Sequence, residues 1–406
     1  MAAIKYWLWL ASQSNVSPRA RAALIAHYGG AEEAFFAPSG DFARLSGLTE
    51  REAALLEERD LSRVDAILAA CRCRSLDVIT MQDADYPDRL KGIFAPPVAL
   101  FVQGSLKGLE ETAAVSVIGT RGATPYGLKM GRRLASQIAG CGGAVVSTLS
   151  PGIDEAAIRA ALLSGGFCVG VLGCAHPENP QALYRDIAAS GALVSEYPPG
   201  TATQKSFFRD RNRIASGLSL AVAVVEAPSN SGALLFAAEA LEQGKEIFAV
   251  PGNADAQNSA GTNALLKQGA RPVTCGWDVL ADYAPLYPTR LHQSRGTLPE
   301  ERVWAAAAPA PEKPVSAPSE KPASAKKEVD KEKSTGYIDL RDQLSGLSAE
   351  QLEIITAIGK GRQHIDDIID ATGLPAAKVL AQLTFLEIKG YISRGAGKRI
   401  SLNIKR

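Results

Sequence analysis

The chain lacks the features that usually mark a metal site, a disulfide scaffold or a membrane segment. Its six cysteines form no C-x-x-C pair, which argues against both zinc ligation and a disulfide framework and fits a reduced compartment. Its four histidines share no short spacing, so no ligand set or catalytic triad can be assembled from them. The N-terminal apolar run is far shorter than the ~20 residues that span a bilayer. We therefore expect a cytoplasmic protein with no membrane segment, metal, cofactor or catalytic residue.

A strong overall charge is also missing. The formal net charge is +1, so any case for nucleic-acid binding must rest on local clusters of cations. One such cluster is KSFFRDRNR, Lys205–Arg213, which holds four cations, one acid and two adjacent phenylalanines. It reads either as a solvated helix start with its rings in the core, or as a strip that binds a nucleic-acid backbone and stacks a base.

The first part of the chain, residues 1–80, reads as a small all-α domain. Ser17 before Pro18, and Thr49 three residues before Glu52, are typical helix starts. Short helices around a tight glycine turn resemble a SAM or helix-hairpin-helix module. Such a turn can bind a DNA phosphate through backbone N–H groups, and the pattern leaves open whether this one does so or only packs.

The middle part, residues 81–290, is α/β in pattern. Short apolar, β-branched runs such as AVSVIG, FCVGVLG and LAVAVVEA alternate with helical segments. This alternation predicts an extended Rossmann-like parallel sheet with helices on both faces. Ligands of such sheets bind beyond the C-terminal ends of the strands, so the loops that follow each run are the candidate site.

The last part contains a linker and a second small domain. Residues 297–336 are rich in Pro, Ala, Lys and Glu, which predicts a disordered linker. Residues 342–406 read as a winged helix, with three helices and a two-stranded ribbon. Its expected recognition helix, 375–389, has no arginine, whereas 389–406 carries six cations and no acid. Protein contact and nonspecific duplex contact both remain open for this domain.

One strand-end loop suggests phosphate binding. VSVIGTRGATPYG gives a strand, then Gly119, Thr120, Arg121 and Gly122, then a helix that starts near Thr124. We expect the helix N-terminus and Arg121 to bind a phosphate. Arg121 stands where the dinucleotide fingerprint G-x-G-x-x-G needs a glycine, which disfavours NAD. The alternative is that Arg121 satisfies strand-end carbonyl groups.

An ordered set of segments resembles the DNA-processing protein A (DprA/Smf) family over nearly the whole chain. The segments are VIGTRGATPYG, GID, LGC, SEYPPG, FFRDRNRIASGLS, VVEAPSNSG and FAVPGN. The resemblance implies a Rossmann domain that forms a homodimer and binds single-stranded DNA. It also implies that the protein loads the recombinase RecA onto that DNA during natural transformation.

The resemblance places the family's binding residues on this sequence. Its K-x-x-F-P-x-R-N-R strip falls on the 205–213 cluster, with Arg209 in place of proline. Phe208 is expected to stack a base, Phe207 to face the core, and the lysine and arginines to bind phosphates. The candidate residues are Gly119, Thr120, Arg121, Gly122, Lys205, Phe208, Arg209, Arg211, Asn212 and Arg213.

The second loop departs from the family pattern. Thr148, Pro151 and Ile158 stand where the family has glycine, arginine and histidine. Thr148 would crowd the backbone, and Pro151 removes a cation, so we expect a reshaped or weaker pocket. Asp154 is retained, either for structural hydrogen bonds or for ligand contact.

Three other titratable residues lie at or just after strand ends. Glu196 and Glu226 each end a strand, and we expect them to organise neighbouring arginines rather than to act as an acid–base pair. His176, in GCAHP, either lines the cleft or lies in the core.

Two alternatives to a DNA-binding mediator remain. A phosphoribohydrolase-like enzyme would need the pattern P-G-G-x-G-T-x-x-E, which neither PSNSGALLFAAE nor PGNADAQNSAGTN completes. A winged-helix regulator would need sequence-specific duplex binding. The sequence therefore favours a protein that binds single-stranded DNA and is not an enzyme.

Overall fold

The computed structural model divides into two units, Met1–Glu312 and Lys313–Arg406. It describes residues 4–293, 349–359, 364–372, 374, 379, 382–383, 386, 392–395 and 399–402. The expected linker at 297–336 and most of the expected recognition helix at 375–389 lie outside the described residues.

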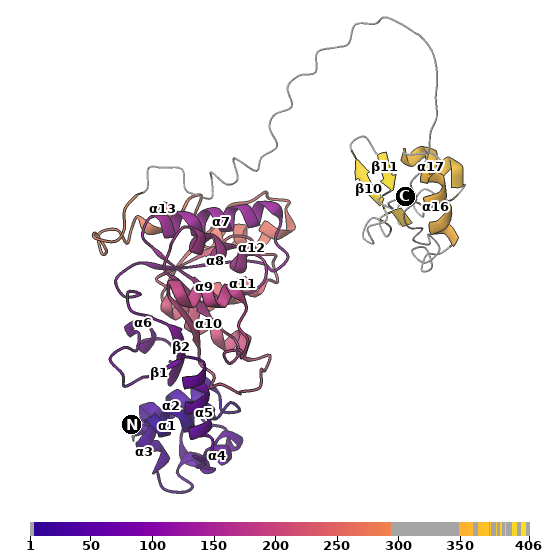
Figure 1. The fold of residues 1–406 in the computed structure, drawn as a ribbon. Helices are drawn as coiled ribbons and strands as arrows, with labels where there is room; N and C mark the ends of the chain where they lie inside the picture. The colour runs from indigo at the N-terminus through magenta and orange to yellow at the C-terminus, as the bar shows by residue number, and fades with distance from the viewer. Residues whose placement is uncertain are drawn as a thin grey trace, which may run out of the picture. The chain divides into compact units, whose positions relative to one another are not determined.

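The chain begins with short helices (Figure 1). They are α1 (Ile4–Ser12), α2 (Pro18–Tyr28), α3 (Ala31–Phe35), the 3-10 helix η1 (Phe42–Arg44), α4 (Glu50–Glu57) and α5 (Val64–Cys73). The predicted helix starts are confirmed. The Ser17 side chain accepts a hydrogen bond from the backbone N–H of Ala20, and Thr49 forms a capping box with Glu52. Gly29, with φ of 84°, ends α2 in the left-handed region that glycine favours.

Glu52 also joins two helix starts, a link that the capping-box pattern does not reveal. One carboxylate oxygen accepts a hydrogen bond of 2.8 Å from the backbone N–H of Ser17, and the other accepts bonds from the backbone and hydroxyl of Thr49. Burial opposes ionisation of this carboxyl, but these hydrogen bonds outweigh it and lower the pKa of Glu52 to about 2.

We expect Glu52→Gln to lower the free energy of unfolding by about 1–3 kcal/mol at pH 7, because hydrogen bonds to a charged acceptor are lost. The folded-state pKa lies below the unfolded value of 4.5, so the wild-type advantage should shrink as the pH falls from about 4.5 towards about 2. Urea unfolding at several pH values measures this. Glu50→Gln, at an exposed position in the same helical turn, is the matched control, and an equal loss for both variants would contradict the assignment.

The next part of the chain forms a nine-stranded sheet in the order β1-β2-β6-β5-β4-β3-β7-β8-β9. The strands from β6 to β9 pair in parallel, whereas β2 pairs antiparallel with both β1 and β6. The strands are β1 (Asp77–Thr80), β2 (Ala99–Gly104), β3 (Ala114–Ile118), β4 (Ala144–Ser147), β5 (Cys168–Val171), β6 (Ala192–Ser195), β7 (Ala221–Val224), β8 (Glu246–Ala249) and β9 (Arg271–Pro272). The Rossmann-like prediction is confirmed, and β1 and β2 extend the sheet beyond the strands read from the sequence.

Helices cover both faces of this sheet (Figure 1). They are α6 (Asp88–Lys91), α7 (Pro125–Gly140), α8 (Ile153–Leu163), α9 (Ala182–Ser190), α10 (Phe207–Leu218), α11 (Gly232–Glu242), η2 (Gln257–Ser259), α12 (Ala260–Lys267) and α13 (Gly276–Leu280). Alternate residues of the strands enter two different buried clusters. One cluster packs under α7, α8, α9 and α13, and the other under α6, α10 and α11. A third cluster joins the N-terminal helices to the outer face of β2.

The second unit is a small domain with its own core. It contains α16 (Ala349–Gly359), α17 (Ile365–Thr372), β10 (Ile392–Gly395) and β11 (Arg399–Leu402). The two strands pair antiparallel, with Ile392 opposite Leu402. Buried residues from both helices and both strands, including Ile354, Ile368 and Ile400, form one cluster. This arrangement supports the predicted winged helix.

Candidate nucleic-acid interface

A groove of about 600 Å³ lies where the sheet topology predicts a ligand site. It is formed by the loops after β3, β4 and β7 and by the first turns of α10 and α11. We call it the basic groove. Its lining residues are Ile118, Gly119, Thr120, Arg121, Thr148, Ser150, Asp154, Lys205, Phe208, Arg209, Arg211, Asn212, Pro228, Asn230, Ser231, Gly232, Ala233, Leu235 and Phe236. The candidate residues are therefore brought together, except Gly122 and Arg213.

Three cations of the groove are available to a ligand. The side chains of Arg121, Lys205 and Arg209 are exposed, and none of them makes a hydrogen bond or ion pair within the part of the chain that the structure describes. The alternative reading of Arg121, as a partner of strand-end carbonyl groups, thus has no support. An unpaired cation at a groove wall suits a phosphate oxygen, and arginine can bind it with two parallel bonds.

The two adjacent phenylalanines of α10 face opposite environments. Phe207 is buried and stacks on the ring of Tyr197, with 3.7 Å between ring centroids, so its predicted place in the core is confirmed. Phe208 is 44% exposed and lines the groove. It packs closely over Gly173, where an added Cβ would come within 2.8 Å of the ring. The backbone of Gly173 thus supports Phe208 while part of the ring remains accessible to a base.

Arg211 lines the groove but is held by the loop after β4. Its guanidinium donates hydrogen bonds to the backbone carbonyl of Thr148 and to the hydroxyl of Ser150, and it lies 5.9 Å from the centroid of the Phe208 ring. Burial lowers its pKa to about 10, so it remains charged at neutral pH. Arg211 therefore fixes the wall of the groove and adds positive potential to it.

Arg213 does not line the groove. It is only 5% exposed, and its guanidinium lies 2.6 Å from the carboxylate of Glu196. The sequence pattern suggested a phosphate contact for this arginine, but its charge is already paired inside the protein. Arg213 is therefore not expected to contact DNA.

The loop after β4 explains one departure from the family pattern. Asp154 is buried and accepts hydrogen bonds from the backbone N–H of Gly119 and from the hydroxyl of Thr148. Burial raises the pKa of Asp154 to about 6, against the opposing effect of these bonds and of the nearby Arg211. The threonine thus gives Asp154 a hydrogen-bond donor that a glycine would lack. Asp154 serves to hold two loops together.

The start of α7 is not free to bind a phosphate, contrary to expectation. The carboxylate of Glu226 accepts hydrogen bonds from the backbone N–H and the hydroxyl of Thr124. It packs against Gly127 so closely that an added Cβ would lie 2.2 Å from a carboxylate oxygen. The helix dipole already has an anion of the protein's own at this position. The start of α7 therefore cannot bind a phosphate in the way that the sequence predicts.

The other strand-end candidates have structural positions. Glu196 pairs with Arg21 and Arg213, as expected of a residue that organises arginines, whereas Glu226 binds a helix start. His176 is buried, and its Nε2 lies 2.8 Å from the carbonyl oxygen of Phe101. Burial lowers the pKa of His176 to about 4. It does not line the groove.

The sequence marked the loop after β7 as part of the candidate site, but none of its residues was named as a binding residue. Pro228, Asn230 and Ser231 of this loop line the groove together with the strip on α10. The available signal was their position directly after a strand, in EAPSNSG, at the edge where a parallel sheet binds its ligands. The sequence alone does not show which of these side chains turns towards the groove.

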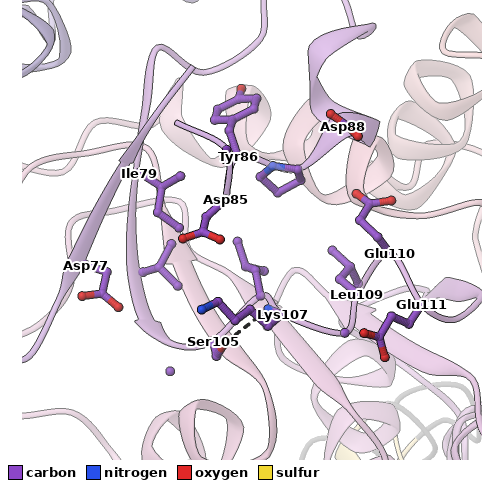
Figure 2. Close-up of a pocket in the computed structure, with 16 residues that line it drawn as sticks. Asp77, Ile79, Asp85, Tyr86, Asp88, Ser105, Lys107, Leu109, Glu110 and Glu111 are labelled. Atoms are coloured by element: carbon purple, nitrogen blue, oxygen red, sulfur yellow. Dashed lines mark hydrogen bonds between the residues drawn. The ribbon is translucent and has the colours of Figure 1, made fainter. Parts of the chain in front are cut away.

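A second groove, of about 490 Å³, has the opposite charge (Figure 2). Its rim carries Asp77, Asp85, Asp88, Glu110 and Glu111, with Lys107 as its lining cation. A polyphosphate backbone would be repelled by this rim. The basic groove is thus the better candidate for nucleic acid.

The described residues hold no cluster of three or more His, Cys, Asp or Glu side chains placed to bind a metal. None of the described helices is long and apolar enough to cross a membrane.

The chain is similar to known proteins along both units. A model of the family described as DNA recombination-mediator protein A matches residues 77–284, and a model of the DprA winged helix domain matches residues 340–398. The chain is 36% identical over 229 residues to DNA processing protein DprA of Bacillus subtilis (strain 168), which covers 55% of this chain and 77% of that protein. It is 31% identical over 362 residues to Protein Smf of Escherichia coli (strain K12), which covers 88% of this chain and 86% of that protein. The X-ray structure of DNA processing protein A (DprA) from Streptococcus pneumoniae is similar with a TM-score of 0.59 and 31% identity, covering 68% of this chain and 97% of that one.

Proposed function

Because the chain belongs to the DNA recombination-mediator protein A family, we propose that it binds single-stranded DNA in the basic groove, without catalytic turnover. The observation that carries the proposal is one accessible aromatic ring, Phe208, beside the unpaired cations Arg121, Lys205 and Arg209. Cations that follow a backbone and a ring that stacks a base are the two parts of single-strand recognition without sequence preference.

The groove favours an unpaired strand over a duplex or a small nucleotide. A base can stack on Phe208 only when its face is exposed, and paired bases in a duplex cover their faces. A nucleotide phosphate would use the start of α7, but Glu226 fills that position. The same contact disfavours the phosphoribohydrolase-like alternative, which needs a phosphate bound by glycines and a helix start.

We further propose that the chain acts as a homodimer through its sheet domain and loads RecA onto the bound strand, as in natural transformation. Two grooves on one strand would add avidity. The division into functional regions 1–80, 81–290 and 342–406 is part of this proposal. Light scattering of the full chain tests the dimer, and RecA filament formation with and without the chain tests the loading.

Salt dependence tests the groove directly. With three unpaired cations on phosphates, log K for a single strand should fall with log[salt] with a slope of about −2, at about −0.7 for each contact. Arg121→Ala should weaken binding and bring the slope about 0.7 closer to zero, because one phosphate contact is lost. Fluorescence anisotropy of a labelled single-stranded oligonucleotide measures both quantities.

The control removes an equal charge elsewhere. Lys107→Ala, at the acidic groove of Figure 2, should leave the affinity and the slope unchanged. A wild-type slope near zero, or equal losses in the two variants, would refute the basic groove as the binding site.

A further inference from the structure

A buried cluster of ion pairs, which we call the ionic joint, connects the N-terminal helices to α10, the helix that carries most of the 205–213 strip. Glu196 follows β6, Arg21 lies on α2, and Arg213 lies on α10. One oxygen of the Glu196 carboxylate lies 3.4 Å from Arg21 and 2.6 Å from Arg213. All three residues are at most 5% exposed. A single carboxylate therefore holds two arginines from distant parts of the chain.

The joint depends on this shared contact. The second carboxylate oxygen of Glu196, two nitrogens of Arg21, the Nε of Arg213 and the hydroxyl of Tyr197 are all buried and have no partner among the described residues. Buried polar groups with so few partners keep their geometry only while the remaining contacts hold. A substitution of Arg21 should thus shift the side chains of Glu196 and Arg213.

The joint reaches the groove by two short routes. Arg213 lies on α10, and the first turn of that helix presents Phe208 and Arg209 to the groove. Tyr197 directly follows Glu196 and stacks on Phe207, the neighbour of Phe208. Both ends of the segment that places the aromatic ring are therefore fixed beside Glu196.

A second contact acts on the same segment. The side-chain amide of Gln204, one residue before Lys205, donates a hydrogen bond of 3.2 Å to the side chain of Asn15 in the turn before α2. The N-terminal part of the chain thus contacts the residue just before the strip directly, and contacts Arg213 at the end of the strip through Glu196.

We propose that Arg21 is a positioning residue for single-strand binding. Through Glu196 it keeps Phe208 and its neighbouring cations in the positions that line the groove, and it does not touch DNA itself. The N-terminal domain thereby contributes to DNA binding by positioning residues of the sheet domain, instead of acting as an independent module. This inference rests on the function proposed above.

The test compares Arg21→Met with two other variants in the full-length chain. Arg21→Met leaves the contact between Glu196 and Arg213 in place, so the domain should still fold. Arg21→Lys keeps the charge. Arg72→Met removes an equal charge from an exposed position on α5 of the same domain. Binding is measured by anisotropy with a labelled oligothymidylate at several salt concentrations, below the melting transition of each variant.

Arg21→Met should weaken binding by about twofold to thirtyfold, the usual range for residues that act on a site through others. The salt slope should stay at the wild-type value, since no phosphate contact is lost. Arg21→Lys should recover most of the affinity, and Arg72→Met should match the wild type. In a Phe208→Ala background, Arg21→Met should cause little further loss of affinity, because Arg21 acts on binding through the position of Phe208.

Hydrogen exchange separates this inference from the proposed function. Amides in residues 205–213 should exchange faster in Arg21→Met than in Arg72→Met, with or without DNA. If wild-type protein fails to bind the oligonucleotide, the proposed function falls, and exchange still reports whether Arg21 orders the strip. Unchanged affinity together with unchanged exchange in folded Arg21→Met would overturn the positioning role, as would a loss that is fully additive with Phe208→Ala.

Discussion

Replacing Glu196 by glutamine is expected to lower the free energy of unfolding by about 3–5 kcal/mol, because removing one partner of a buried ion pair leaves charge without compensation. The substitution keeps the shape of the side chain but leaves Arg21 and Arg213, both nearly fully buried, without their shared anion. Urea unfolding of the full chain, followed by tryptophan fluorescence, measures the loss in the transition of the first unit.

The control for this prediction is another glutamate of an ion pair. Glu178 lies 2.7 Å from Arg74, but its side chain is 80% exposed. Exposed pairs contribute about 0–1 kcal/mol, so Glu178→Gln should cost little. Similar losses for the two variants would show that the Glu196 joint is solvated and does not bear on stability.

Replacing Phe208 by alanine is expected to weaken single-strand binding by about 1–3 kcal/mol, the usual value of one base stacked on an aromatic ring. The salt slope should not change, because the ring makes no phosphate contact. The anisotropy titration described for Arg121→Ala measures both quantities. Together the two variants separate stacking from charge.

Two further variants make the Phe208 result specific. Phe208→Trp should keep most of the affinity, since tryptophan offers a larger stacking face. Phe36→Ala removes a ring that is 64% exposed on the N-terminal helices and should leave binding unaltered. Binding by Phe208→Ala that equals the wild type would rule out the stacking role.

The fold could be predicted from the sequence wherever a buried element produces a recognisable run of apolar residues. The parallel strands are buried on both faces, so AVSVI and AVAV stand out as short apolar runs between helices. β1 was missed because only one residue of its sequence, DVIT, is buried, so the strand leaves no apolar run. β2 is apolar, but its antiparallel pairing with β6 depends on partners far along the chain.

The site was predicted less completely, because helix rotation is decided by packing. Arg209 and Arg213 are four residues apart and should share a face of α10. Arg209 is nevertheless exposed and Arg213 buried, because Glu196 at the end of β6 offers Arg213 a buried partner. The start of α7 is a similar case, since its anion comes from Glu226, 102 residues further on. Contacts of this range leave no local signal in the sequence.

The carboxylate of Glu226 at the start of α7 also affects how well small phosphates can compete for the groove. A bare helix start attracts any small phosphate, from orthophosphate to a free nucleotide. Here the start of α7 is satisfied from within by Glu226, and the groove carries the separate side-chain cations Arg121, Lys205 and Arg209. One small anion gains little from such a set, whereas a polymer engages several of its cations at once. On the function proposed above, Glu226 is expected to reduce competition from free phosphate and mononucleotides, so that affinity should rise with the length of the strand.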